Sequence, residues 1–412
     1  MLSDLNFREA QIWVQTTKAS KVRIHYFEID SSTNKYKTPI IVTEEAKACT
    51  ANFILTKIEP NRSYGYQVEV DDVLCKDVYT FKSPNYFHEK SLPPDFSIAL
   101  LGSHYAIDDF FEPPYVRLGS SYGIFEKILQ FKPDLVIWAG NTAHLRKSDA
   151  SSINGYYKRY SHARSNINPK AFLAEIPNLG IWSSNDYGPK NSGNEMSLKN
   201  EALEAFSLFW PKANSVKHQE ALCYSHKYSD VELFFIDVQS QRDSFQKKES
   251  FPSILGEEQI NWLKNNIINS DATFKIIVSG APILNPETSP KNFSFAKKEK
   301  EELLDFFKLH DIKGLFFVSG GSYKGELTRI VHSSYYSFYD LTLGPSTAVP
   351  INKDSELNYF RIPGTNTFEQ QFTILKVAGQ GNQRSIELNI YSIAGLKIWS
   401  RTIEVKELSI IE

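Results

Sequence analysis

The alternation of apolar and polar residues predicts a first, all-β part of the chain. Between residues 10 and 82, apolar and polar positions alternate with a period of two, which is typical of half-buried β-strands. The clearest of these strands are Gln11–Gln15, Lys21–Tyr26 and Ser63–Val70. Their spacing predicts a small β-sandwich of the immunoglobulin or fibronectin type over residues 1–82.

A different pattern begins at residue 96. Short, continuous apolar runs alternate with segments of helical periodicity, which indicates an α/β core whose sheets are covered on both faces. The predicted strands are 96–101, 135–138, 179–182, 231–236, 274–278 and 314–318, and the predicted helices are 123–131, 197–209, 256–266 and 297–309. Residues 83–95 contain two proline-bearing, turn-forming stretches, so we predict a linker there.

Alternating strands return near the end of the sequence, at Gln371–Val377, Ile386–Tyr391 and Ile398–Ile403. We find no internal repeat and no low-complexity tract. The predicted organisation is therefore a β-domain over residues 1–82, a linker over 83–95 and a second domain over 96–412.

Composition and charge exclude several classes of protein. The 412 residues carry a formal net charge of −2, with 46 Lys and Arg against 48 Asp and Glu, so a dedicated nucleic-acid binder is not expected. No run approaches the roughly 18 apolar residues of a transmembrane helix. Three cysteines cannot build a disulfide framework or a cysteine-rich zinc site, and the sequence leaves open whether Cys49 and Cys75 pair.

The first residues, Met1–Phe7, lack the basic region, apolar run and cleavage site of a signal peptide. We therefore expect either a cytoplasmic protein or a chain numbered without its leader. These residues do not separate the two.

The residues that follow the predicted strands are the place to look for chemistry, because ligands bind beyond the carboxyl ends of the strands in α/β sheets. They are Gly102-Ser103-His104-Tyr105, Gly140-Asn141-Thr142-Ala143, Ser183-Ser184-Asn185-Asp186, Asp237-Val238-Gln239-Ser240, Ser279-Gly280-Ala281-Pro282 and Ser319-Gly320-Gly321-Ser322. Further motifs with recognisable order and spacing lie in the segments 8–16, 133–140, 177–182, 186–189, 235–237, 325–327, 339–342 and 361–365.

In order and spacing, these motifs resemble the alkaline phosphatase D (PhoD-like) family of metallophosphatases over nearly the whole chain. The resemblance implies a small β-domain followed by a calcineurin-like α/β/β/α sandwich. It also implies a two-metal centre that hydrolyses phosphoesters.

The metal-ligand positions depart from the family pattern. The family's Gly-Asp-Asn-Ile-Tyr becomes a motif with Asn141 and His144 at the Asp and Tyr positions, and His104 replaces a cysteine. The other family motifs are Trp-Asp-Asp-His-Asp, Asp-x-Arg and Ser-Gly-Asp-x-His. They become Trp182-Ser183-Ser184-Asn185-Asp186, Asp237-Val238-Gln239 and Ser319-Gly320-Gly321-Ser322-Tyr323.

A two-metal phosphoesterase needs carboxylates and imidazoles that hold two cations roughly 3.5–4 Å apart and lower the pKa of a bridging water. Neutral Asn, Ser and Gly supply neither the charge nor the donors. We therefore predict an inactive pseudophosphatase with no catalytic residue, no metal and no cofactor, in which Asp186 and Asp237 are structural. The predicted vestigial pocket consists of His104, Asn141, His144, Ser183, Ser184, Asn185, Asp186, Asp237, Gln239, Gly321 and Tyr323.

The resemblance also suggests a role, because the family is generally exported and envelope-associated. We expect an extracytoplasmic structural or interaction subunit of a cell-envelope or surface complex, with protein partners and no transmembrane segment of its own. The aromatic segments 156–160 and 333–339 are candidate partner contacts. The sequence identifies neither the partner nor the oligomeric state.

Two alternatives stay open. One is a divergent phosphodiesterase or phosphatase whose metal site is rebuilt from His104, His144, Asp186, Asp237 and Tyr323. The other is a small-molecule or peptide-binding module, in which the neutral polar residues 141 and 183–185 bind an uncharged sugar or peptide.

Overall fold

The computed structural model describes residues 1–31, 34–88, 90–112, 115, 117–215, 221–244, 251–289, 292–351 and 358–410. The first 82 residues form two sheets, with strand orders β1-β2-β6 and β4-β3-β7-β8; β5 also pairs with β3, and β9 with β7. These strands are β1 (Leu2–Leu5), β2 (Ala10–Gln15), β3 (Lys21–Glu28), β4 (Lys35–Lys37), β5 (Ile41–Val42), β6 (Thr50–Leu55), β7 (Ser63–Val70), β8 (Val73–Leu74) and β9 (Tyr79–Lys82).

The two-residue alternation in this part of the chain builds a sandwich core. In β3, for example, Val22, Ile24 and Tyr26 are buried while the residues between them are more exposed. They pack in one apolar cluster with residues of β1, β2, β6 and β7. The predicted β-sandwich is thus confirmed. Cys49 is buried, Cys75 is exposed, and the two are not disulfide-bonded.

Two six-stranded sheets form the α/β core, with strand orders β12-β11-β10-β19-β20-β21 and β13-β14-β15-β16-β18-β17. The strands of the first sheet are β10 (Phe96–Leu101), β11 (Leu135–Ala139), β12 (Asn178–Ile181), β19 (Gln371–Ala378), β20 (Ser385–Ser392) and β21 (Lys397–Glu404). Those of the second are β13 (Tyr224–Tyr228), β14 (Val231–Ile236), β15 (Phe274–Ser279), β16 (Leu315–Ser319), β17 (Glu326–Ile330) and β18 (Phe338–Thr342). Every strand predicted after residue 96 exists within two residues of its expected bounds.

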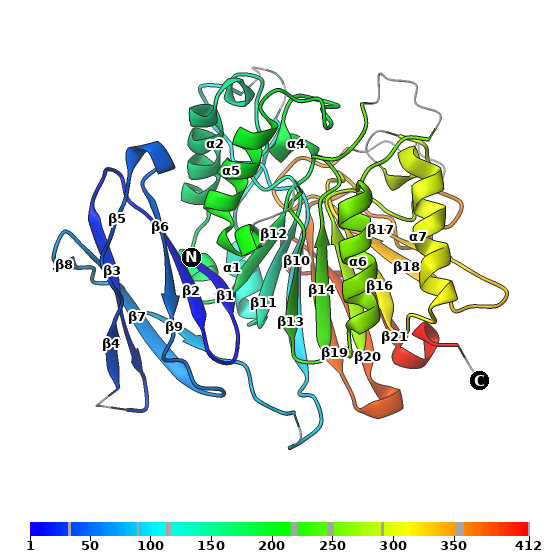
Figure 1. The fold of residues 1–412 in the computed structure, drawn as a ribbon, viewed down its shortest axis with the longest axis horizontal. Coiled ribbons are helices and arrows are strands. Elements are labelled where there is room, and N and C mark those ends of the chain that lie inside the picture. Colours follow the sequence, from blue (N-terminus) through cyan, green and yellow to red (C-terminus); the bar gives the residue numbers. More distant parts are fainter. Residues whose placement is uncertain are drawn as a thin grey trace.

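The helices are α1 (Ile124–Gln130), α2 (Ile153–Ser165), α3 (Ala171–Ala174), α4 (Ser184–Tyr187), α5 (Lys199–Phe209), α6 (Glu257–Asn269) and α7 (Lys297–Leu309). Helices α6 and α7 lie in front of the second sheet, and β19 and β20 lie behind it (Figure 1). Aromatic contacts fix this packing: Trp262 of α6 meets Phe234, and Phe307 of α7 meets Phe317. On the other side, Phe125 of α1 packs against Trp138 of the first sheet.

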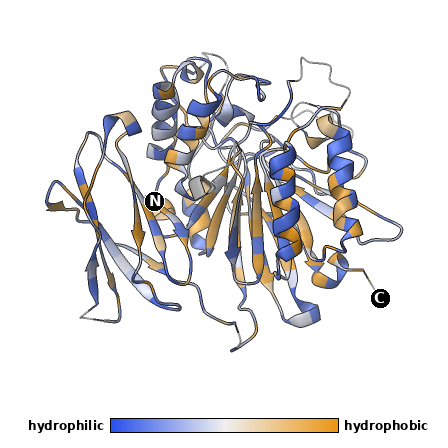
Figure 2. Cartoon of the chain, in the orientation of Figure 1, coloured by the Kyte–Doolittle hydropathy of each residue, from blue (hydrophilic) through white to orange (hydrophobic). Residues whose placement is uncertain are grey.

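The hydropathy colouring follows these layers, with apolar strands inside and the polar faces of α6 and α7 outside (Figure 2). This is the predicted sandwich of two sheets between helices. None of the helices in the described ranges is both long and apolar enough to cross a bilayer.

The β-sandwich is held against the α/β core by directed contacts. The indole Nε1 of Trp13 donates to the carbonyl of Leu208 at 2.9 Å, and Tyr66 Oη donates to the carbonyl of Ala174 at 2.8 Å. Buried Asp4 pairs with Lys212 at 2.8 Å. Between the two parts, the described residues of 83–95 contain neither helix nor strand. The domain boundaries at residues 82 and 96 stay predictions.

Both aromatic segments that we considered as partner contacts are largely inside the molecule. Tyr156, Tyr157 and Tyr160 are buried on α2, and Tyr335 and Tyr336 are buried beside α7. Their rings serve the core, so they do not provide exposed anchors for a partner.

Candidate functional site

Glycines allow the strand-end loops of the two sheets to interlock. A Cβ atom on Gly320 would overlap the carbonyl oxygen of Ala139, at the end of β11 in the opposite sheet. A Cβ on Gly280 would overlap the carbonyl of Trp182, and one on Gly140 would lie 2.5 Å from the Ser183 Cβ. The backbones therefore approach one another more closely than any side chain allows. The loops after β11, β12, β15 and β16 meet at this point, beneath the candidate site.

A closed series of hydrogen bonds between uncharged groups forms the floor of the candidate site. Asn141 Nδ2 donates to Ser103 Oγ at 2.9 Å, and Ser103 Oγ donates to the carbonyl of Ser322 at 2.9 Å. The backbone N–H of Asn185 donates to Asn141 Oδ1 at 3.3 Å, and Asn185 Nδ2 donates to Tyr323 Oη at 2.8 Å. Since Tyr323 follows Ser322, the chain closes on itself. These side chains satisfy one another's hydrogen bonds.

Asp186 anchors the loop that follows β11. Its fully buried carboxylate accepts the backbone N–H groups of Thr142 at 2.9 Å, Ala143 at 2.7 Å and His144 at 3.3 Å, and that of Ser183 at 3.2 Å. Burial raises the pKa of Asp186, and these donors oppose the shift. The loop can wrap around the carboxylate because Asn141 and His144 both adopt positive φ angles, of 52° and 55°.

Asp237 has a similar structural environment next to Trp182. It accepts the Trp182 indole N–H at 2.6 Å and the backbone N–H groups of Leu222, Gln239 and Ser240 at 2.8–3.1 Å. The neighbouring Gln239 side chain is buried. The oxygens of both surviving aspartates therefore accept hydrogen bonds from protein groups, most of them backbone N–H groups.

The two histidines do not face the same space. His104 is fully buried, with Nδ1 2.8 Å from Thr347 Oγ1 and its ring against those of Phe125 and Trp138. His144 instead has Nδ1 3.3 Å from Tyr323 Oη. Burial, followed by the charge of Arg159, lowers the pKa of His104 to about 3 and that of His144 to about 4. Both imidazoles are therefore neutral at pH 7.

A pocket of about 430 Å³ opens above this floor. The predicted residues that line it are His144, Ser184, Asn185, Gly321 and Tyr323. The other predicted residues lie outside this lining; they are His104, Asn141, Ser183, Asp186, Asp237 and Gln239, all buried.

The rest of the lining was not anticipated from the sequence. It contains the cations Arg117, Lys190 and Arg242, the apolar side chains Leu118, Val349, Pro350 and Ile351, and Asn191. Lys190 and Arg242 lie within two residues of motifs noted in the sequence, but none of these lining residues belongs to a motif, so neither periodicity nor spacing marks them.

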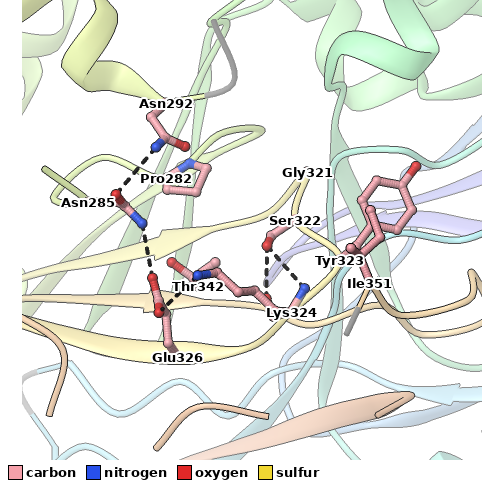
Figure 3. Close-up of a pocket in the computed structure, with 10 residues that line it drawn as sticks. All are labelled: Pro282, Asn285, Asn292, Gly321, Ser322, Tyr323, Lys324, Glu326, Thr342 and Ile351. Carbon is pink, nitrogen blue, oxygen red and sulfur yellow. Dashed lines mark hydrogen bonds and ion pairs between the residues drawn. The ribbon is translucent and has the colours of Figure 1, made fainter. Parts of the chain in front are cut away.

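A smaller cavity adjoins the pocket and shares Gly321, Tyr323 and Ile351 with it. Its polar wall is a hydrogen-bonded series in which Asn292 Nδ2 donates to Asn285 Oδ1, and Asn285 Nδ2 donates to Glu326 Oε1 (Figure 3). Glu326 is fully buried and lies 3.6 Å from the ammonium group of Lys324. We interpret this buried network as a set of stabilising contacts between the segments that follow β15 and β16.

Across the described ranges, no group of three or more His, Cys, Asp or Glu side chains is placed to hold a metal ion. At the floor of the pocket the available donors are amides, hydroxyls, a phenol and one imidazole. The burial-raised pKa of Tyr323 keeps its phenol protonated at neutral pH. This donor set does not fit a two-cation centre, which needs several anionic ligands.

Replacing Asp186 with asparagine should lower the free energy of unfolding by about 2–3 kcal/mol. An amide NH₂ would face backbone N–H groups that now donate to a carboxylate oxygen, and unsatisfied buried donors cost on the order of 1–3 kcal/mol. Urea unfolding followed by tryptophan fluorescence measures the change. Asp30→Asn, the same exchange at an exposed turn residue, is the control. Equal stability of Asp186→Asn and the parent would contradict the anchoring role.

Comparisons with known proteins agree with this architecture. The family model described as "PhoD-like phosphatase" matches residues 121–347, more than half of the chain. Alkaline phosphatase D of Bacillus subtilis (strain 168) is 21% identical over 326 residues, covering 68% of this chain and 54% of that protein. The chain thus spans about half the length of this curated relative.

Among solved structures, one described as "Structure of PhoD" superimposes with a TM-score of 0.73 at 15% sequence identity. The match covers 98% of this chain and 91% of the other, so the fold is shared through both the β-sandwich and the α/β core. Together with the family match, these observations identify the chain as a member of the PhoD-like phosphatase family.

Proposed function

We propose that this chain is a catalytically inactive PhoD-like pseudophosphatase that serves as a structural or interaction subunit of a cell-envelope complex. The observation that carries the proposal is the closed series of neutral hydrogen bonds among Ser103, Asn141, Asn185, Tyr323 and the Ser322 carbonyl. In this series, side chains at positions where the family resemblance implies metal ligands bind one another.

The charge of the site supports the same proposal. Asp186 is saturated by four backbone donors, and Asp237 lies behind Trp182. The described residues that line the pocket include no carboxylate, so two divalent cations would instead face Arg117, Lys190 and Arg242. Coulomb repulsion then opposes metal binding.

The framing residues of the loops nevertheless remain. Gly140, Gly280 and Gly320 still permit the close approach of the two sheets. We expect a protein to keep its fold but lose its metal ligands when it contributes a binding surface and no longer catalyses a reaction. The envelope location rests on the family resemblance alone.

The rebuilt-enzyme alternative has one favourable feature, the contact of His144 with Tyr323. His104, however, lies in an aromatic environment outside the pocket lining, and both aspartates are occupied. These positions do not form the cluster that the alternative requires.

Metal content and turnover, measured on one sample, test the proposal. We expect less than about 0.1 equivalent of any transition metal or calcium per chain after purification without chelator, and no hydrolysis of bis(4-nitrophenyl) phosphate. The reason is the lack of charge compensation for cations. One or two ions per chain, together with turnover that His144→Ala abolishes, would establish an enzyme with a new ligand set.

A tagged copy of the chain, isolated from its own cells under native conditions, tests the role in a complex. We expect it to migrate in a defined assembly larger than the single chain. Migration as a single chain under mild, low-salt conditions would contradict the proposed subunit role.

A further inference from the structure

The pocket above the hydrogen-bonded floor has a strongly one-sided charge. Its lining contains Arg117, Lys190 and Arg242, and among the described residues that line it there is no Asp or Glu. Arg117 and Lys190 are exposed, and within the described ranges neither forms an ion pair. Arg242 is 3% exposed and donates from Nη2 to the carbonyl of Ser192 at 2.6 Å. Three cations in one lining create a positive potential inside a concave surface.

A fourth cation reinforces this potential from behind the pocket wall. Arg159 is fully buried on α2, and its Nε donates to the carbonyl of His144, which lines the pocket, at 3.0 Å. Neither Nη nitrogen of Arg159 has a hydrogen-bond partner in the described part of the chain. The charge of Arg159 is strong enough at this wall to contribute to the lowered pKa of His144.

Another part of the lining is apolar. Leu118, Val349, Pro350 and Ile351 contribute to it, and an isolated bridge between Gly119 and Ala348 holds their two segments together. Val349 and Ile351 are 36% and 49% exposed. The volume of about 430 Å³ falls in the range of small-molecule sites. The complementary ligand therefore carries a negative group and an apolar group.

We propose that this pocket is a metal-independent binding site for an organic anion, a carboxylate or a phosphate ester, that carries an apolar group. The proposal deepens the proposed function and rests on it, since the ligand is bound and not turned over. It differs from the neutral sugar or peptide considered from the sequence. Neutral side chains of the floor, such as Asn141 and Asn185, are engaged in hydrogen bonds within the protein, whereas Arg117 and Lys190 are exposed.

Isothermal titration calorimetry in buffer containing EDTA tests the site with four probes. Phenyl phosphate and 3-phenylpropionate combine an anion with an apolar ring, whereas inorganic phosphate and phenol carry only one of these features. We expect both amphipathic anions to bind at least tenfold more tightly than inorganic phosphate or phenol. The two anions also distinguish a phosphate-ester preference from a carboxylate preference.

Substitutions locate the binding in this pocket. Lys190→Gln and Arg117→Gln should each weaken the binding of the preferred anion about fivefold, because each removes one exposed charge near the ligand. Lys376→Gln makes the same charge change on an exposed residue of β19 and should leave affinity unchanged. Raising the salt concentration should weaken binding by screening these cations.

The outcomes separate this inference from the proposed function. Failure of both amphipathic anions to bind at millimolar concentration overturns the inference and leaves the pseudophosphatase proposal standing. Binding that Lys190→Gln and Arg117→Gln do not weaken also overturns the inference. Hydrolysis of phenyl phosphate overturns the proposed function, and binding that appears only when a divalent metal is added overturns both.

Discussion

Replacing Gly320 with alanine is expected to prevent stable folding. The new Cβ would occupy the position of the Ala139 carbonyl oxygen. That carbonyl cannot retreat, because β11 is paired on both sides, with β10 and β12. Gly320 is held as well, since its N–H donates to the carbonyl of Ser279 at 2.8 Å. Overlap of a Cβ atom with a fixed backbone carbonyl is more severe than ordinary overpacking of side chains, which costs roughly 1–3 kcal/mol.

We therefore expect Gly320→Ala to lower the free energy of unfolding by more than about 4 kcal/mol, which is a large part of the stability of a typical domain. Soluble yield and urea unfolding by tryptophan fluorescence measure it. Gly123→Ala is the matched control, because a Cβ there meets nothing closer than 3.5 Å and its backbone is helical. A Gly320→Ala protein with an unchanged unfolding midpoint would refute the interlocked arrangement of the two sheets.

Acidification from pH 7.5 to pH 5 is expected to destabilise the protein by about 4 kcal/mol through His104 and His144. Burial, and then Arg159, lowers their pKa values to about 3 and about 4 in the folded state. In the unfolded chain both titrate near pH 6.5. Below that pH the unfolded chain binds more protons than the folded one, so stability is present above about pH 6.5 and is lost as the pH falls. Each histidine then contributes about 2 kcal/mol over this interval.

Urea unfolding between pH 7.5 and 5 measures this slope. The double substitution His104→Gln and His144→Gln removes both titrating groups and should flatten the profile, whatever its effect on stability at pH 7.5. The exposed His310→Gln is the control and should leave the slope as it is. A double variant with the parent's slope would assign the acid sensitivity to other groups.

The α/β core shows how much local pattern predicts. Phe96–Leu101 and Lys297–Leu309 form a strand and a helix with the predicted bounds, since continuous apolar runs and helical periodicity are properties of neighbouring residues. Periodicity did not predict helix α2, because its buried face carries tyrosines and Arg159 in place of an aliphatic stripe. The predicted β-strands near the end exist, but periodicity could not show that β19 pairs with β10, whose paired residues lie 273 to 281 positions earlier.

The candidate site also has features that the sequence predicts and features that depend on the tertiary structure. The strand-end residues of the sequence include the glycines that let the sheets interlock and lack most of the carboxylates of a two-metal centre. Where a side chain points is a tertiary property. His104 turns into an aromatic environment, Asp186 turns toward the backbone of the loop after β11, and only some predicted residues reach the pocket.

The two folding patterns, the position of the strand-end loops and the neutral character of the residues in them can all be predicted from the sequence. These follow from residue type and from spacing along the chain. The three-dimensional fold is needed to show that the neutral residues bind one another and that Arg117, Lys190 and Arg242 line the same pocket. Those three cations lie on separate loops. The loops come together only because the two sheets pack against each other, and a pattern of neighbouring residues does not contain that information.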